Sequence, residues 1–119
     1  MSPAAKSVYY FGLYLYLVGI TLIVVPNFLL SCLQLPPTNE VWIRVVGVLV
    51  FCIGYYYHKA GQNNIGAFFI HTIPTRLFVF AAFIFFALMQ YVSPLLIIFG
   101  AVDFAGAMWT LLALRKENK

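Results

Sequence analysis

One acidic residue stands in the middle of an apolar run near the end of this chain. Asp103 lies within residues 100–110, GAVDFAGAMWT. Arg44 and Arg76 stand in apolar runs of their own, and Glu40 precedes Arg44 by about one helical turn. Ionisable groups inside a membrane segment are costly unless they are paired, so they mark functional sites or structural necessities. We therefore expect these four side chains to form one buried polar centre.

The composition of the 119-residue chain places that centre in a membrane. Hydrophobic residues make up 64% of the sequence and charged residues only 8%, whereas a soluble domain carries about 25% charged residues. The net charge of +4 comes mostly from the tails and one loop, which indicates contact with lipid headgroups. We therefore expect an integral membrane protein whose partners are membrane lipids, other membrane subunits or further copies of itself, and not nucleic acid.

Four apolar runs are long enough to cross a bilayer, because about 20 helical residues span a hydrocarbon core of about 30 Å. The connections between them are short, and short connections favour antiparallel neighbours. The predicted fold class is all-α: a polytopic membrane protein with four transmembrane helices in an up-down-up-down antiparallel bundle. We expect one domain, residues 1–119, with spans at about 8–30, 40–57, 66–91 (kinked at Pro74) and 94–114.

Pro74 leaves the third run open to two interpretations. In one, a single long helix is kinked at Pro74 and Arg76 lies near the middle of the membrane. In the other, Pro74 begins the span and Arg76 snorkels to the headgroups. We favour the kinked helix, because the segment before Pro74 is apolar without a polar face. Arg76 then reaches the level of Asp103, and we predict an ion pair between them. A second pair is predicted between Glu40 and Arg44.

Glycines recur at seven-residue spacing in the first two runs. Gly12 and Gly19 share one helix face, and Gly47 and Gly54 share a face with Arg44. Small residues on a membrane helix let a neighbouring helix approach closely. Glycine is also common in membrane helices for other reasons, so packing and composition explain the first pair equally well. The second face should point toward protein, because an arginine facing lipid is costly.

Other polar side chains inside the runs could satisfy the arginines or contact a headgroup. Tyr16, Gln90 and Thr110 are the candidates, and Ser7 is expected to cap the first helix. His58 and His71 fall at similar depth, and a metal or haem site between two histidines is conceivable. Neither lies in a ligand motif, so we expect no metal and no cofactor.

The distribution of positive charge predicts an orientation. Lys6, the loop at 58–65 and residues 115–119 all fall on one side of the predicted bundle. Cytoplasmic loops of membrane proteins carry an excess of lysine and arginine. We therefore expect both termini in the cytoplasm and the chain in a bacterial inner membrane.

Three short motifs carry a family resemblance: RVVG at 44–47, GYY at 54–56 and DFAGAMWT at 103–110. They are similar to the small bacterial four-span membrane proteins grouped as DoxX-like. The resemblance covers the second and fourth runs and implies a four-helix membrane fold but no settled activity. Some DoxX relatives are described as subunits of quinone-linked oxidoreductases. Size and span number also resemble the small multidrug resistance exporters, which use a membrane-embedded glutamate in their first helix; the first run here has no acid.

The sequence leaves three functions open. The first is a non-enzymatic accessory or scaffold subunit, or a lipid-binding helper. The second is a small oligomeric transporter that uses Asp103 and the arginines, and the third is a quinone- or haem-associated redox subunit. No catalytic triad or phosphate-binding loop is recognisable, so we do not expect an enzyme. An acid paired with arginine stays ionised, which argues against proton cycling and favours binding of a polar headgroup.

Overall fold

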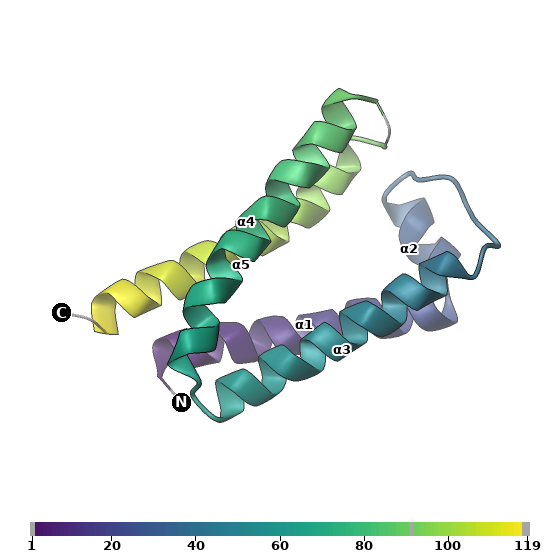
Figure 1. The fold of residues 1–119 in the computed structure, drawn as a ribbon. Helices are drawn as coiled ribbons and strands as arrows, with labels where there is room; N and C mark the ends of the chain where they lie inside the picture. Colours follow the sequence, from purple (N-terminus) through teal and green to yellow (C-terminus); the bar gives the residue numbers. More distant parts are fainter. Residues whose placement is uncertain (1, 91, 118–119) are drawn as a thin grey trace.

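The computed structural model describes residues 2–90 and 92–117 and is all-helical. This part of the chain folds into two helical hairpins, α1 with α3 and α4 with α5, which diverge from each other like the arms of a V (Figure 1). Residues 1, 91, 118 and 119 lie outside the described residues, so the end of the predicted third span and of the C-terminal tail are not covered. The helices are α1 (Pro3–Val24), α2 (Pro26–Cys32), α3 (Trp42–Gln62), α4 (Gly66–Leu88) and α5 (Leu95–Glu117).

The first predicted span is divided between two helices. α1 begins at Pro3, because the Ser2 side chain accepts a hydrogen bond of 3.1 Å from the Ala5 N–H and proline is favoured at the first helical position. Ser7, the predicted cap, lies inside the helix instead. Pro26 has no N–H to continue the helical ladder, so α1 ends before it and α2 begins there.

Three helices, α1, α4 and α5, are long and apolar enough to cross a membrane, and they mark the chain as a membrane protein. The prediction of four transmembrane helices is therefore wrong. α3 is 21 residues long but is not among the three. Arg44 lies near its first turn, and its last third, residues 55–62, reads YYYHKAGQ. These polar groups at both ends offset the apolar residues of its middle.

α1 and α3 pack backbone to backbone through their glycines. A Cβ atom built on Gly12 would lie 2.9 Å from the carbonyl oxygen of Gly54, and one on Gly19 would lie 2.9 Å from that of Gly47. Only glycine permits this approach, because any side chain would overlap the opposing helix. The two predicted glycine faces are therefore confirmed, and they face each other.

The two hairpins meet where α1 begins, α3 ends and α5 ends; we call this end of the molecule the apex. The Ser2 hydroxyl donates to the Asn64 side-chain oxygen at 2.9 Å, and the Ala4 N–H donates to Glu117 Oε1 at 3.3 Å. The main buried cluster gathers here, and most of its members are small or aromatic. It contains Ala4, Ala5, Val8, Phe11, Tyr57, Ala60, Phe69 and Ala113.

The predicted four-helix bundle is wrong, since the hairpins separate away from the apex (Figure 1). Alanines on α1 and α5, such as Ala4 and Ala113, allow close packing at the apex. Further along, Tyr14 of α1 and Phe99 of α5 stand between the hairpins, with ring centroids 6.2 Å apart. Large aromatic side chains on facing helices keep the helix axes apart, so the arms stay open.

α4 continues through Pro74, as the favoured interpretation predicted. Proline supplies no N–H and disturbs the carbonyls of the preceding turn. Nearby side chains provide donors in that turn. The Thr75 hydroxyl lies 3.4 Å from the His71 carbonyl oxygen and 3.0 Å from that of Thr72, and Arg76 Nε donates to the Thr72 carbonyl at 3.2 Å. Such side-chain donors let proline lie inside a membrane helix.

Candidate functional site: the cleft between the hairpins

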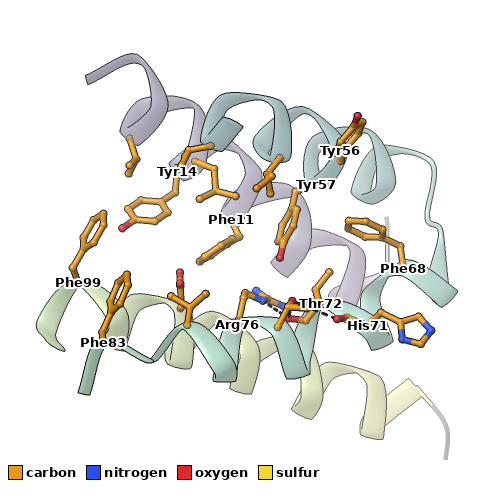
Figure 2. A pocket seen from close by; sticks show the side chains of 17 residues that line it. Phe11, Tyr14, Tyr56, Tyr57, Phe68, His71, Thr72, Arg76, Phe83 and Phe99 are labelled. Atoms are coloured by element: carbon orange, nitrogen blue, oxygen red, sulfur yellow. Dashed lines mark hydrogen bonds between the residues drawn. The ribbon is translucent and has the colours of Figure 1, made fainter. Parts of the chain in front are cut away.

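The arms of the V enclose a cleft of about 640 Å³. Side chains of α1 and α3 face those of α4 and α5 across it (Figure 2). Its surface is almost entirely apolar, with valine, leucine, isoleucine, phenylalanine and tyrosine from all four helices. The charged side chains that line it are Arg76 and Asp103. These two residues therefore decide what polar chemistry the cleft offers.

Arg76 is held on the apex side of the cleft, with only 2% of its surface exposed. Its Nη2 donates to Thr72 Oγ1 at 2.7 Å and to Thr110 Oγ1 at 2.8 Å. The guanidinium carbon lies 4.9 Å from the ring centroid of Phe11 and 5.6 Å from that of Tyr57, within the range of cation–π attraction. All these partners are neutral, so they hold the cation without neutralising its charge.

Ser7 connects α1 to this arginine. Its Oγ lies 2.6 Å from Thr110 Oγ1, and both side chains are fully buried. Ser7 Oγ also lies 2.7 Å from the Ala4 carbonyl oxygen, and Thr110 Oγ1 lies 3.1 Å from that of Gly106. Hydrogen bonds therefore run from Ser7 through Thr110 to Arg76, joining α1, α5 and α4 at one point.

The remaining arginine nitrogen, Nη1, is buried and has no hydrogen-bond partner among the described residues. A Cβ atom on Gly106 would lie 2.9 Å from Nη1 and 3.0 Å from the Phe11 ring, so the missing side chain at Gly106 makes room for both groups. Nη1 therefore keeps unpaired donors but is enclosed, whereas Nε and Nη2 are already engaged.

Asp103, unlike Arg76, has no side-chain partner among the residues the structure describes that engages its charged group. It is half-buried and lines the cleft. No hydrogen bond or ion pair joins its carboxylate to another residue in the described ranges. The charge of Arg76 acts on it only through space. The carboxylate oxygens are thus available to whatever occupies the cleft.

The predicted ion pair between Arg76 and Asp103 is not formed, and side-chain direction gives the reason. Long side chains on a helix point toward its N-terminus. Arg76 therefore runs back toward Thr72, where it meets Thr110 of the antiparallel α5. Asp103 lies seven residues from Thr110, about 10 Å along the helix. Nη1 lies nearer, beside Gly106 and three residues from Asp103, but within the described structure no ion pair joins it to the carboxylate.

The structure places Glu40 and Arg44 at the other end of the α1–α3 hairpin, and both side chains are exposed. Glu40 precedes α3, and its N–H donates to Thr38 Oγ1 at 3.1 Å. Arg44 donates through Nη1 to the Ile23 carbonyl of α1. No ion pair joins the two in the described structure, because Glu40 is outside the helix that was expected to align them. The four predicted residues therefore separate into two in the cleft and two outside it.

The remaining candidates are dispersed. The Tyr16 hydroxyl lies 3.0 Å from His58 Nδ1, between α1 and α3. His71 is exposed and lines the cleft, and Gln90 is exposed just after α4. Of the three predicted headgroup contacts, Thr110 contacts Arg76. Within residues 2–90 and 92–117, no group of three histidine, cysteine or acidic side chains is placed to hold a metal ion.

Sequence reasoning missed several residues that hold the arginine. Thr72 stands four positions before Arg76 on the same helix face, and that spacing could have identified it. Ser7 and Phe11 share a face of α1 by the same spacing, although Ser7 was interpreted as a cap. Tyr57 lies in the last third of α3 and contacts the arginine from there. Its contact with the arginine depends on how the hairpins meet, which spacing does not reveal.

Comparison of the chain with protein-family models, with curated proteins and with solved structures finds no match.

Proposed function

We propose that this chain is a non-enzymatic lipid-binding membrane protein that holds the apolar part of a membrane amphiphile between its two hairpins. The observation that carries this proposal is the cleft of about 640 Å³ with its apolar lining. Ligand sites of about 300–1,000 Å³ with apolar walls and a few polar groups hold molecules of drug-like size. Its apolar walls favour acyl chains or the apolar part of a ligand over water.

The apex supports the proposal because it gives the cleft a fixed base. Arg76 binds threonines on two helices and lies against rings from α1 and α3. These contacts hold the two hairpins at one end while the aromatic side chains keep them apart further out. A site that is already formed loses less conformational freedom when its ligand binds.

The test is to fill the cleft. Val79 lines it, so Val79→Trp should remove most of the space for a chain. The matched control is Leu17→Trp, because Leu17 is 66% exposed on the outer face of α1. Native mass spectrometry of the protein from nanodiscs should show a retained amphiphile in the wild type and the control and little in Val79→Trp. Equal retention in all three would refute the proposal.

As the wider setting, we propose a bacterial inner membrane with the apex toward the cytoplasm. The support is the positive charge of Lys6, Lys59, Arg115 and Lys116, together with the apex contacts that bring these segments to one end of the molecule. The protein would act there as a helper or accessory subunit of a membrane complex. Labelling of an introduced cysteine near Lys116 in intact cells tests the orientation, because only a periplasmic site reacts with an impermeant reagent.

A second candidate function, transport by an oligomer, has one observation in its favour: the Asp103 carboxylate faces the cleft without a partner. Ionisable groups in water-accessible membrane cavities mark ion and substrate pathways. Counterflow of a labelled substrate in proteoliposomes would distinguish transport from binding. Uptake that depends on Asp103 supports transport, whereas retention of ligand without flux supports the lipid-binding helper.

A further inference from the structure

We infer that the cleft selects amphiphiles with a single positively charged ammonium group, which the Asp103 carboxylate binds while the apolar walls hold the attached chain. This inference rests on the proposed lipid-binding function and adds the class of ligand. It depends on which of the two charged side chains in the cleft, Arg76 or Asp103, a ligand can contact.

The accessible charge in the cleft is negative. Arg76 is 98% buried, its Nε and Nη2 are engaged, and its Nη1 is enclosed by Gly106 and Phe11. Asp103 is half-buried and has no contacting partner in the described part of the chain. A charge in an apolar site is costly until an opposite charge neutralises it. A cationic group beside Asp103 therefore gains most, whereas an anionic group there meets a like charge.

The surroundings of Asp103 suit an organic cation better than a metal ion. Calcium needs six to eight oxygen ligands, whereas the described residues that line the cleft contain one carboxylate. Aromatic rings also line the cleft and gather at one end of it (Figure 2), namely Tyr14, Phe83 and Phe99. Ring faces attract ammonium groups by the cation–π interaction, most strongly when water is excluded. One carboxylate together with several rings matches a bulky ammonium group.

The position of Asp103 also leaves room for a chain. Phe99 lies one helical turn before Asp103 on the same face of α5, on the side away from the apex, and both residues line the cleft. Val18 of α1, Val50 of α3 and Val79 of α4 line the neighbouring walls. An alkyl chain attached to the ammonium group can lie against these valines, because burial of each CH₂ contributes about 0.8 kcal/mol.

The experiment compares three probes of equal chain length, dodecyltrimethylammonium, dodecanol and dodecanoate, below their micellar concentrations. Binding is measured on the full chain in nanodiscs by competition with a radiolabelled dodecyl probe. We expect the wild type to bind the cation roughly tenfold more tightly than the alcohol, and the anion most weakly. Asp103→Asn should bind the cation no better than the alcohol, and Asp103→Glu should restore the preference. Glu40→Gln removes an exposed carboxylate elsewhere and should change nothing.

The outcomes separate this inference from the proposed function. If Asp103→Asn keeps the preference for the cation, the inference is overturned, although loss of all three probes in Val79→Trp would still support a binding cleft. If Val79→Trp binds every probe as the wild type does, the proposed function itself fails.

A parallel experiment with lysophosphatidylethanolamine as the competitor identifies the source of the ammonium group. Competition by this lipid indicates a membrane lipid, and competition by the alkylammonium alone indicates a soluble lipophilic cation.

Discussion

The two contacts that α1 makes are built in opposite ways. The contact with α3 is made by glycines, because Gly12 and Gly19 lie against Gly54 and Gly47 with no side chain between the two backbones. Against α4 and α5, α1 uses polar and aromatic side chains, from Ser7 and its neighbours to Arg76 and Thr110. The first contact is close along most of the helix, whereas the second is close at the apex and is continued only by aromatic side chains such as Tyr14 and Phe99. The comparison shows how one helix can be fixed on one side and leave a cleft on the other.

The difference predicts different sensitivities to substitution. A backbone contact tolerates no added atoms, whereas a side-chain network tolerates replacement of a member when the hydrogen bonds that remain are satisfied. The substitutions below run from the largest expected effect to the smallest.

Gly54→Leu should be the most damaging change. A Cβ atom at Gly54 would lie 3.0 Å from the Gly12 carbonyl oxygen, so the side chain must force α1 and α3 apart. Overpacking in a rigid contact costs about 3 kcal/mol or more in the free energy of unfolding. The matched control is Gly66→Leu, because Gly66 has open space around its Cβ position. Similar losses in thermal midpoint for both variants would contradict the close backbone contact.

Arg76→Ala should come next, at about 2–3 kcal/mol. It removes the hydrogen bonds to Thr72 and Thr110 and opens a cavity beneath two aromatic rings. Arg44→Ala, an exposed arginine on α3, should cost less than about 1 kcal/mol. Unfolding titrations in a mild detergent compare the two variants. Equal stability of the Arg76→Ala and Arg44→Ala variants would show that the hydrogen bonds of Arg76 at the apex do not stabilise the fold.

Thr110→Val should cost about 1 kcal/mol, because it keeps the shape of the side chain and loses its hydroxyl. A double-mutant cycle with Ser7→Ala tests whether the two hydroxyls interact. If the 2.6 Å contact between them contributes to stability, the double variant should lose less than the sum of the single losses. Strictly additive losses would show that the two residues act independently.

Asp103→Asn should have the smallest effect, within about 0.5 kcal/mol. The carboxylate contacts no partner in the described structure, so its loss strands no arginine. An ion pair with Arg76 would instead make the loss of stability large, because breaking a buried pair costs about 3–5 kcal/mol. A large drop in thermal midpoint would therefore show that the two residues pair in the membrane.

The glycine pattern shows what sequence can predict about this fold. Gly12, Gly19, Gly47 and Gly54 were identified from spacing alone, and they form the contact between α1 and α3. Helix faces depend on local geometry, which the sequence specifies directly. The number of spans was overestimated, because Arg44 and the polar residues after Tyr57 reduce the apolar character of α3. Its length alone was not evidence of a membrane span.

The charged centre shows where sequence reasoning fails. Arg76 and Asp103 were placed at one level by counting residues, but a side chain reaches several ångströms along its helix from its own Cα atom. Arg76 reaches back to Thr72 and Thr110, so its hydrogen bonds are made at a different level from that of Asp103. The V shape also depends on which residue sizes meet between hairpins, such as Ala113 at the apex and Phe99 further out. The sizes of the residues that meet depend on how two helices pair, which the pattern along one helix does not specify.

The paired glycines have a consequence for register. A surface that repeats every seven residues matches itself again after a shift of seven residues, about 10 Å. The shifted α1–α3 pair would set Gly12 against Gly61 and Gly19 against Gly54, so glycine would again meet glycine. The glycines therefore permit two alignments and do not choose between them.

The choice of alignment is made at the ends of the hairpin. At the apex, Ser2 is bonded to Asn64 at 2.9 Å. At the other end, the Thr38 N–H donates to the Asn27 side-chain oxygen at 2.9 Å within the connection between the helices. A hairpin slipped by one repeat would move Ser2 about 10 Å from its present position relative to α3 and lose its hydrogen bond to Asn64. The length of the connection from residue 25 to residue 41, together with the hydrogen bond inside it, fixes the register of α1 against α3.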